Sequence, residues 1–147
     1  MNIRPATSAD CAALAAIDRA GNPAPWSAVQ FQTALNSRFD TVLLAEHQGW
    51  PAAFIVWQTV ADESELHLIA TAPESRRLGL AAALMQCWFE AAAAQSVRRL
   101  LLEVRAANLP AQNLYRRHGF TECGRRRDYY SLPDGTREDA VLMEKPC

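Results

Sequence analysis

The residues from Glu65 to Val104 restrict the possible folds of this chain more than any other segment. They form a strand-type run, a long helical run and a second strand-type run, with Pro73 after the first. The helical run, from about Gly79 to Gln95, repeats apolar side chains at helical spacing, at Leu80, Leu84, Trp88 and Ala91 or Ala92. A strand, a crossover helix and a second strand of the same sheet run parallel with a right-handed connection. We therefore expect a parallel strand pair with a helix packed on it.

The remaining segments add antiparallel strands and further helices to that unit. β-branched and aromatic residues on either side of Gln48-Gly49 predict a hairpin, and Ser27 with Gln30 three positions later is typical of a capping box. The run Arg99–Val104 is apolar enough to predict a central strand covered on both faces. The expected strands lie near Asn2–Arg4, Thr41–His47, Ala52–Val60, Glu65–Thr71, Arg99–Val104, Thr121–Arg127 and Ala140–Glu144, and the expected helices near Thr7–Ala20, Ser27–Asn36, Gly79–Gln95 and between Asn108 and Gly119. This order describes an α/β fold with one mixed sheet and helices on its faces.

Length, charge and residue spacing exclude several classes of function. A length of 147 residues without a repeat or a linker fits one domain, which we take to span 1–147. The net charge of −1 gives no general attraction to nucleic acid or to an anionic membrane, and Gln86 and Glu90 interrupt the most apolar stretch. The chain does not begin with a secretory signal pattern, and its cysteines and histidines lack zinc-ligand spacing. We expect a cytoplasmic protein with free thiols and no metal, whose oligomeric state the sequence leaves open.

The turn Arg76–Ala82 is the first candidate binding site. It follows a strand and opens a helix, where free main-chain N–H groups and the positive end of the helix dipole favour an anion. Gly79 and Ala81 keep the approach clear, and Arg76 and Arg77 add positive charge. The same residues would also suit an ordinary helix start with solvent-facing arginines. The glycine-rich dinucleotide pattern and the P-loop pattern are both absent.

Two residues downstream are candidates for proton transfer. Glu103 ends an apolar run, where partial burial would raise the pKa of its carboxyl toward that of a useful base; the alternative is an exposed glutamate paired with Arg105. Tyr115 follows a leucine on the next helix, a position typical of the core, yet a phenol can also donate a proton to a thiolate. Cys87 and Cys123 are rival nucleophiles, although neither has a histidine at a motif spacing.

The pattern Arg-x-x-Gly-x-Ala from Arg76 to Ala81 resembles the acyl-CoA-binding motif of the GNAT family of N-acetyltransferases. The residues from Glu103 to Phe120 and the order of the elements resemble the same family. The resemblance implies that the sheet splays after the fourth strand, that the pantetheine of acetyl-CoA fills the gap, and that its pyrophosphate sits on the turn. It implies contacts between acetyl-CoA and Ile69, Ala70, Arg76, Arg77, Leu78, Gly79, Leu80, Ala81, Ala82, Asn108 and Tyr115. By the same resemblance, Glu103 is the general base and Tyr115 the general acid.

Three further segments, Pro25-Trp26-Ser27, Arg127 to Tyr130 and Arg137 to Ala140, resemble family members that act on ribosomal proteins. The resemblance implies direct acetyl transfer to a protein N-terminus, first of all the N-terminal alanine of the eighteenth small-subunit ribosomal protein. Residues that could line a groove for this acceptor and attract its ammonium are Trp26, Tyr129, Tyr130 and Glu138. The alternatives are a small amine as acceptor and a non-catalytic acyl-CoA-binding module. The presence of both Glu103 and Tyr115 argues against the module.

Overall fold

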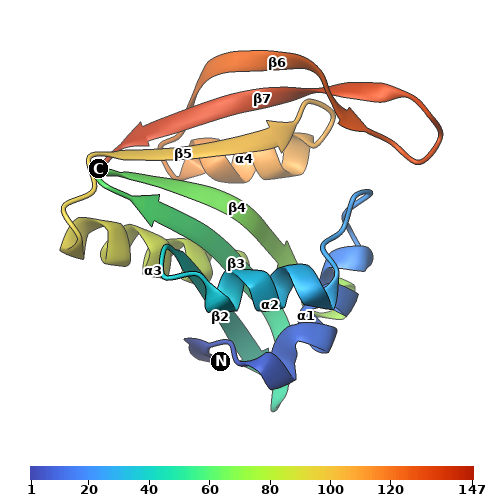
Figure 1. The fold of residues 1–147 in the computed structure, drawn as a ribbon, viewed down its shortest axis with the longest axis vertical. Helices are drawn as coiled ribbons and strands as arrows, with labels where there is room; N and C mark the ends of the chain where they lie inside the picture. The colour runs from blue at the N-terminus through green and yellow to red at the C-terminus, as the bar shows by residue number, and fades with distance from the viewer.

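The computed structural model describes residues 1–147 and arranges them around a seven-stranded sheet of order β1-β2-β3-β4-β5-β7-β6 (Figure 1). β4 and β5 are parallel and all other neighbours are antiparallel, which confirms the expected mixed sheet. The strands are β1 (Asn2–Pro5), β2 (Asp40–His47), β3 (Trp50–Val60), β4 (Glu63–Thr71), β5 (Arg99–Arg105), β6 (Thr121–Ser131) and β7 (Arg137–Pro146). The α-helices are α1 (Cys11–Arg19), α2 (Ala28–Asn36), α3 (Leu80–Ala94) and α4 (Leu109–Arg117).

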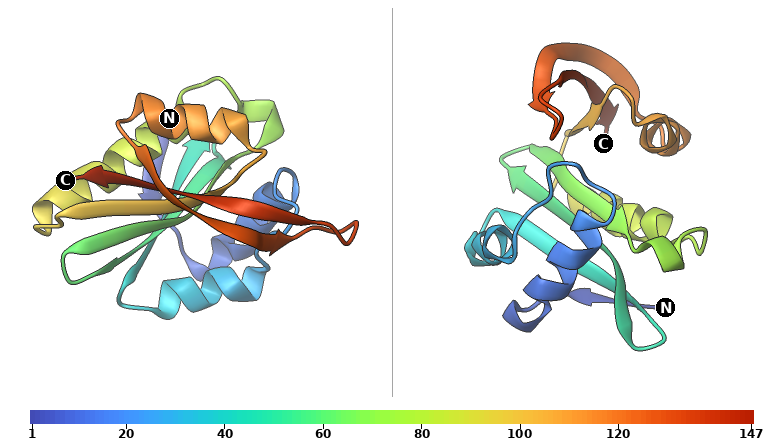
Figure 2. Two further views of the ribbon diagram at one scale, coloured as in Figure 1. Left: turned by 90° about the horizontal axis from the view of Figure 1, so that it is seen from above. Right: turned by 90° about the vertical axis from the view of Figure 1, so that its right-hand side faces the viewer.

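Helices cover both faces of the sheet, with α1 and α2 on one face and α3 and α4 on the other (Figure 2). Alternate residues of β3 enter two apolar cores, so that Ile55 packs toward α3 and Phe54 toward α1 and α2. A strand segment buried on both faces must be apolar throughout, which explains the unbroken apolar run Ala52–Trp57 of β3. None of the helices has the length and apolarity required to cross a membrane.

The helix starts follow the expected capping chemistry. Ser27 and Gln30 form a reciprocal capping box at the start of α2, and the side-chain oxygen of Asn108 caps α4. The helix expected from Thr7 onward begins with a short 3-10 turn, Ser8–Asp10, before α1. These ends were predictable because each cap bonds to main-chain groups only three residues away.

Two expectations about the strands are wrong. On β5, Leu100, Leu102 and Val104 are buried against α3 and α4, whereas Leu101 and Glu103 on the other face are only partly buried. The reason is that α1 and α2 pack mainly against β2, β3 and β4. The last two strands are also longer than expected, because the polar residues of their hairpin continue to pair through the main chain without apolar alternation.

β4 and β5 stay together for only four residue pairs, which join Glu63–Leu66 to Arg99–Leu102. At this point β4 also carries a bulge, because His67 is an extra residue without a partner on β3. A bulge bends its strand and increases the local twist, and beyond it β4 diverges from β5 (Figure 1). The splayed sheet implied by the family resemblance is therefore confirmed.

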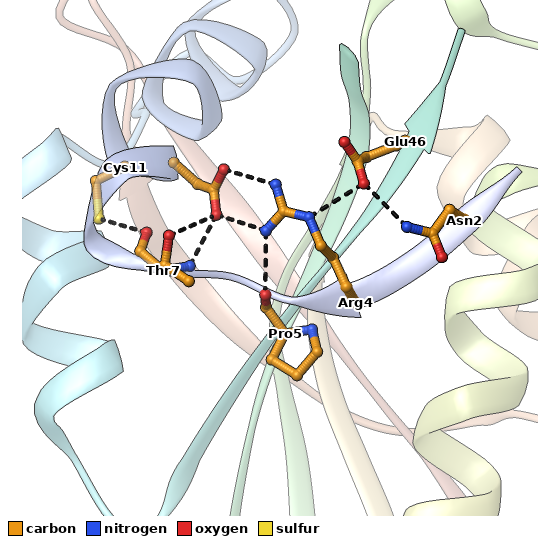
Figure 3. A network of polar contacts seen from close by, with 7 residues as sticks. Asn2, Arg4, Pro5, Thr7, Cys11 and Glu46 are labelled. Carbon is orange, nitrogen blue, oxygen red and sulfur yellow. Dashed lines mark hydrogen bonds and ion pairs between the residues drawn. The ribbon is translucent and has the colours of Figure 1, made fainter. Parts of the chain in front are cut away.

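A network of polar contacts ties β1 to the start of α1 and to β2 (Figure 3). Arg4 donates to the two carboxylate oxygens of Asp10 at 2.8 and 2.9 Å, and to Glu46 at 3.1 Å. Asp10 also accepts the main-chain N–H of Thr7 at 2.8 Å and is buried. The hydrogen bond from Arg4 is the main cause that lowers the pKa of Asp10 to about 2, although burial opposes it.

This network predicts a specific pH dependence of stability. The pKa of Asp10 is lower in the folded chain than its ordinary value of 3.8, so its contribution is complete well above that value and is lost as the pH falls toward 2. The contribution is about 2 kcal/mol at neutral pH, and about half of it is gone at pH 3. Asp10→Asn should therefore lower the free energy of unfolding in urea more at pH 7 than at pH 3. An equal effect at both pH values would contradict this prediction.

Candidate active site

The divergence of β4 from β5 opens a cleft of about 960 Å³. Its walls are the β4–β5 gap, the turn before α3, one side of α4, the loop between α1 and α2, and the β6–β7 hairpin. All but two of the predicted binding and reacting residues line it: Trp26, Ile69, Ala70, Arg76, Arg77, Gly79, Leu80, Ala81, Ala82, Glu103, Asn108, Tyr115, Tyr129 and Tyr130. The two that do not are Leu78 and Glu138. The fold thus brings together residues that lie about a hundred positions apart in the sequence.

The turn before α3 is shaped by two residues in the left-handed conformation. Arg77 and Gly79 have φ angles of 66° and 77°, and Gly79 is the N-cap of α3. No atom lies within 4 Å of the position that a Cβ on Gly79 would take, so the main chain is open to a ligand there. The free N–H groups of the first helical turn and the flanking Arg76 make this turn suitable for an anion. Leu78, between the two left-handed residues, is 49% exposed and lies outside the cleft.

The edge of β4 beyond Leu66 carries main-chain groups that β5 does not bond. Ile69 and Ala70 pair with β3 on one side only, because β5 has already moved away. In an extended strand, neighbouring residues direct their N–H and C=O groups to opposite sides. One of these two residues therefore presents both groups to the cleft. The edge can accept an extended ligand as a further strand would.

Glu103 lies on β5 just after the strand has parted from β4. The residue before it, Leu102, points into the core beneath α3 and α4, so the side chain of Glu103 points to the opposite face. Its carboxylate forms an ion pair with Arg126, whose Nε atom lies 3.1 Å from Oε1, and 20% of its side chain is exposed. Arg105, the partner considered from the sequence, pairs with Glu138 at 3.7 Å instead. Glu103 is therefore accessible from the cleft but is neutralised by an arginine of β6.

Tyr115 reaches the cleft from the helical layer formed by α3 and α4. It is 6% exposed and packs edge-on against Phe120, with ring centroids 6.1 Å apart. It is thus a core residue and a cleft residue at once. Burial raises the pKa of its phenol, and the neighbouring Tyr130 adds to the effect. The phenol therefore keeps its proton at neutral pH and remains a donor.

Aromatic side chains of β6 line the cleft on the side of the β6–β7 hairpin. The strand is irregular before Tyr130, where Asp128 has a φ of 51° and donates its main-chain N–H to Asp139 at 2.9 Å. The rings of Tyr129 and Tyr130 meet edge to face, 5.1 Å apart. Burial, followed by the charge of Glu103, raises the pKa of Tyr130 to about 12. The two phenols therefore form a neutral, aromatic wall.

Glu138 does not line the cleft. Its carboxylate accepts the main-chain N–H of Ala107 at 2.7 Å and pairs with Arg105. These contacts fix the connection between β5 and α4. Glu138 lies opposite Tyr130 in the β6–β7 pairing, but its carboxylate is engaged in holding the start of α4.

Two residues that local sequence patterns did not single out also belong to the site. Asp18, in the last turn of α1, lines the cleft although only 2% of it is exposed. Arg126 holds Glu103, but in the sequence it is one of three consecutive arginines. The only local signal was the placement of Asp18 on the buried side of α1 beside Ile17. The contact of Arg126 with Glu103 depends on strand pairing, and Asp18 bonds a loop without regular secondary structure, so residue spacing could not reveal either contact.

The other chemically reactive side chains differ in whether they line the cleft. Cys87 and Cys123, the rival nucleophiles, do not line the cleft. Burial raises the pKa of the Cys87 thiol, and nearby Glu90 adds to the effect. His67, the bulged residue of β4, does line the cleft. The geometry therefore favours direct transfer over a cysteine-bound intermediate.

The sequence profile of the acetyltransferase (GNAT) family matches residues 11–120. The ribosomal protein bS18-alanine N-acetyltransferase of Escherichia coli strain K12 is 38% identical over 130 residues, which cover 88% of this chain and 86% of that protein. The crystal structure of the ribosomal-protein-S18-alanine N-acetyltransferase from Escherichia coli has a TM-score of 0.90 at 35% identity and covers 99% of this chain and 92% of that one. NAA60 of Arabidopsis thaliana in complex with acetyl-CoA shares the fold, with a TM-score of 0.86 at 20% identity over 99% of this chain and 97% of that one. Because the profile spans most of the sequence and the E. coli relative aligns over nearly all of it, this chain belongs to the acetyltransferase (GNAT) family.

Proposed function

We propose that this chain is an acetyl-CoA-dependent N-acetyltransferase whose acceptor is the N-terminal α-amine of a protein, in the first place the N-terminal alanine of ribosomal protein bS18. The observation that carries the proposal is that one cleft joins an anion-binding helix start, a carboxylate on β5 and a protonated phenol on α4. The likeness to the E. coli enzyme, which extends over nearly the whole chain, supports the choice of acceptor.

Acetyl-CoA fits the chemistry of the cleft at two places. Its pyrophosphate would bind the N–H groups at the start of α3 and the guanidinium groups of Arg76 and Arg77, with the space beside Gly79 open to it. Its pantetheine arm would extend along the free edge of β4 at Ile69 and Ala70. Asn108 uses its side-chain oxygen to cap α4, which leaves its amide N–H groups for the ligand.

Glu103 and Tyr115 would divide the proton transfers. An α-ammonium group has a pKa of roughly 8, so it must lose a proton before the amine can attack. Glu103 takes this proton, directly or through a water molecule. When the C–N bond forms and the C–S bond breaks, Tyr115 gives its proton to the sulfur and recovers the second proton that the nitrogen loses. The products are the N-acetylated chain and the free thiol of CoA.

The acceptor would approach between Trp26 on one side and Tyr129 and Tyr130 on the other. These aromatic side chains provide contact area for several residues of an extended peptide, whereas a small amine would leave most of it unused. Glu138 is not part of this proposal, because its carboxylate is engaged at the β5–α4 connection.

Removing either proton-transfer group should slow the chemical step without unfolding the chain. Glu103→Gln and Tyr115→Phe preserve size and shape, and each should lower kcat by about 10²–10⁴-fold, the range of a general acid or base. The rate of CoA release from acetyl-CoA and an alanine-initiated peptide measures this effect. Wild-type kcat in both variants would refute the assigned roles.

Gly79→Ala tests the phosphate turn against a matched control, Gly49→Ala. The two glycines have similar φ angles, 77° and 83°, and neither has an atom within 4 Å of a new Cβ. Both changes should therefore strain the main chain equally, by about 1 kcal/mol. Only Gly79→Ala should weaken acetyl-CoA binding, measured by calorimetry, because its Cβ enters the space proposed for the pyrophosphate. Equal affinities in the two variants would argue against this site.

The acceptor class is tested by a panel of peptides and small amines supplied with acetyl-CoA. A peptide with the N-terminal sequence of bS18 should react with the highest kcat/KM, followed by other alanine-initiated peptides. Polyamines and amino acids should react weakly, because they do not reach the aromatic walls. If a small amine reacts best, the acetyltransferase assignment stands and the protein acceptor is rejected.

A further inference from the structure

The carboxylate of Asp18 is buried in the wall of the cleft without a cationic partner. Its Oδ2 atom accepts the main-chain N–H of Trp26 at 2.8 Å, and the side-chain amide of Asn22 lies 3.4 Å from each carboxylate oxygen. Burial raises the pKa of this carboxyl, and the hydrogen bonds from Trp26 and Asn22 lower it. A carboxylate at this place in α1 costs desolvation energy that an apolar residue would avoid. The hydrogen bonds of Asp18 offset this cost.

These hydrogen bonds close the loop that connects α1 to α2. The main-chain carbonyl of Asp18 accepts the N–H groups of Gly21 and Asn22, and its side chain holds the far end of the loop at Trp26. The indole of Trp26 packs edge-on against Phe31 of α2, with centroids 5.3 Å apart. The loop has no regular secondary structure, so one residue fixes both of its ends. The loop residues that line the cleft are Gly21, Asn22, Pro23, Ala24 and Trp26.

We propose that Asp18 is a positioning residue, which holds this loop in the shape that receives the N-terminus of the acceptor. The inference rests on the function proposed above, because it takes the acceptor to pass between this loop and the β6 tyrosines. Asp18 acts through the Trp26 amide, and its essential property is an oxygen acceptor at the Oδ2 position. The negative charge itself is not needed, so asparagine should replace it.

The proposal is tested with Asp18→Ala and Asp18→Asn, with Asp10→Ala as the matched control. Asp10 is also a buried carboxylate beside α1, but its partners are Arg4 and Thr7, away from the cleft. With an alanine-initiated peptide, Asp18→Ala should raise the peptide KM about tenfold, as expected for one lost hydrogen bond that leaves an N–H unpaired, while the KM for acetyl-CoA changes less than about threefold. Asp18→Asn should keep the peptide KM within about threefold of wild type, since it retains an acceptor oxygen. Asp10→Ala should lower the melting temperature and leave both KM values unchanged.

A second measurement tests the anchor without any acceptor. Hydrogen exchange at the Trp26 amide should be protected in the wild type and in Asp18→Asn, and should become fast in Asp18→Ala, while the amides of β3 stay protected in all three. If the wild type acetylates no peptide, the proposed function fails and this exchange pattern still decides whether Asp18 shapes the loop. The proposal is overturned if Asp18→Ala keeps the Trp26 amide protected, or if Asp10→Ala raises the peptide KM as much as Asp18→Ala.

Discussion

The short parallel contact between β4 and β5 is the constraint on which the rest of the structure depends. Four residue pairs join the two halves of the sheet, and the bulge at His67 then turns β4 away. If the pairing continued, β5 would bond the main-chain groups that either Ile69 or Ala70 now presents to the cleft, and no cleft would exist. Because the strands part, β4 offers an open edge, while β5 remains held by β7 along its whole length. The apolar core beneath α3 and α4 spans both halves and keeps them together.

Much of this fold was predictable because its signals are local. The caps at Ser27 and Asn108, and the helical spacing of Leu84 and Trp88, depend on residues a few positions apart. The partial exposure of one face of β5 was not predictable, because an apolar run does not reveal which strands α1 and α2 cover. The partner of Glu103 likewise depends on the register of the β5–β7 and β6–β7 pairs, which brings Arg126 to it rather than Arg105. The family pattern indicated which residues gather in the cleft, and only the fold could show that Leu78 and Glu138 lie outside it.

Three carboxylates of this chain show how one functional group acquires different roles from its surroundings. Asp10 bonds a guanidinium and a main-chain N–H, and it stabilises the junction of β1 and α1. Asp18 bonds only N–H groups of a loop, so its hydrogen bonds stabilise the conformation of that loop. Glu103 keeps an exposed fraction and a single cationic partner, so its carboxylate can change partners. Burial and the kind of donor, rather than the residue type, separate these roles.

The ion pair between Glu103 and Arg126 also determines how an acceptor would first meet the protein. A carboxylate already neutralised by a guanidinium projects little field into solvent, and Arg127, next to Arg126 on β6, adds positive charge to that strand. An approaching ammonium group is therefore not drawn in from a distance by this carboxylate, since long-range steering requires an uncompensated charge of opposite sign. In the proposed mechanism, the encounter would depend instead on contact with the aromatic walls, and the ammonium group would replace the guanidinium at Glu103 only after the acceptor has docked.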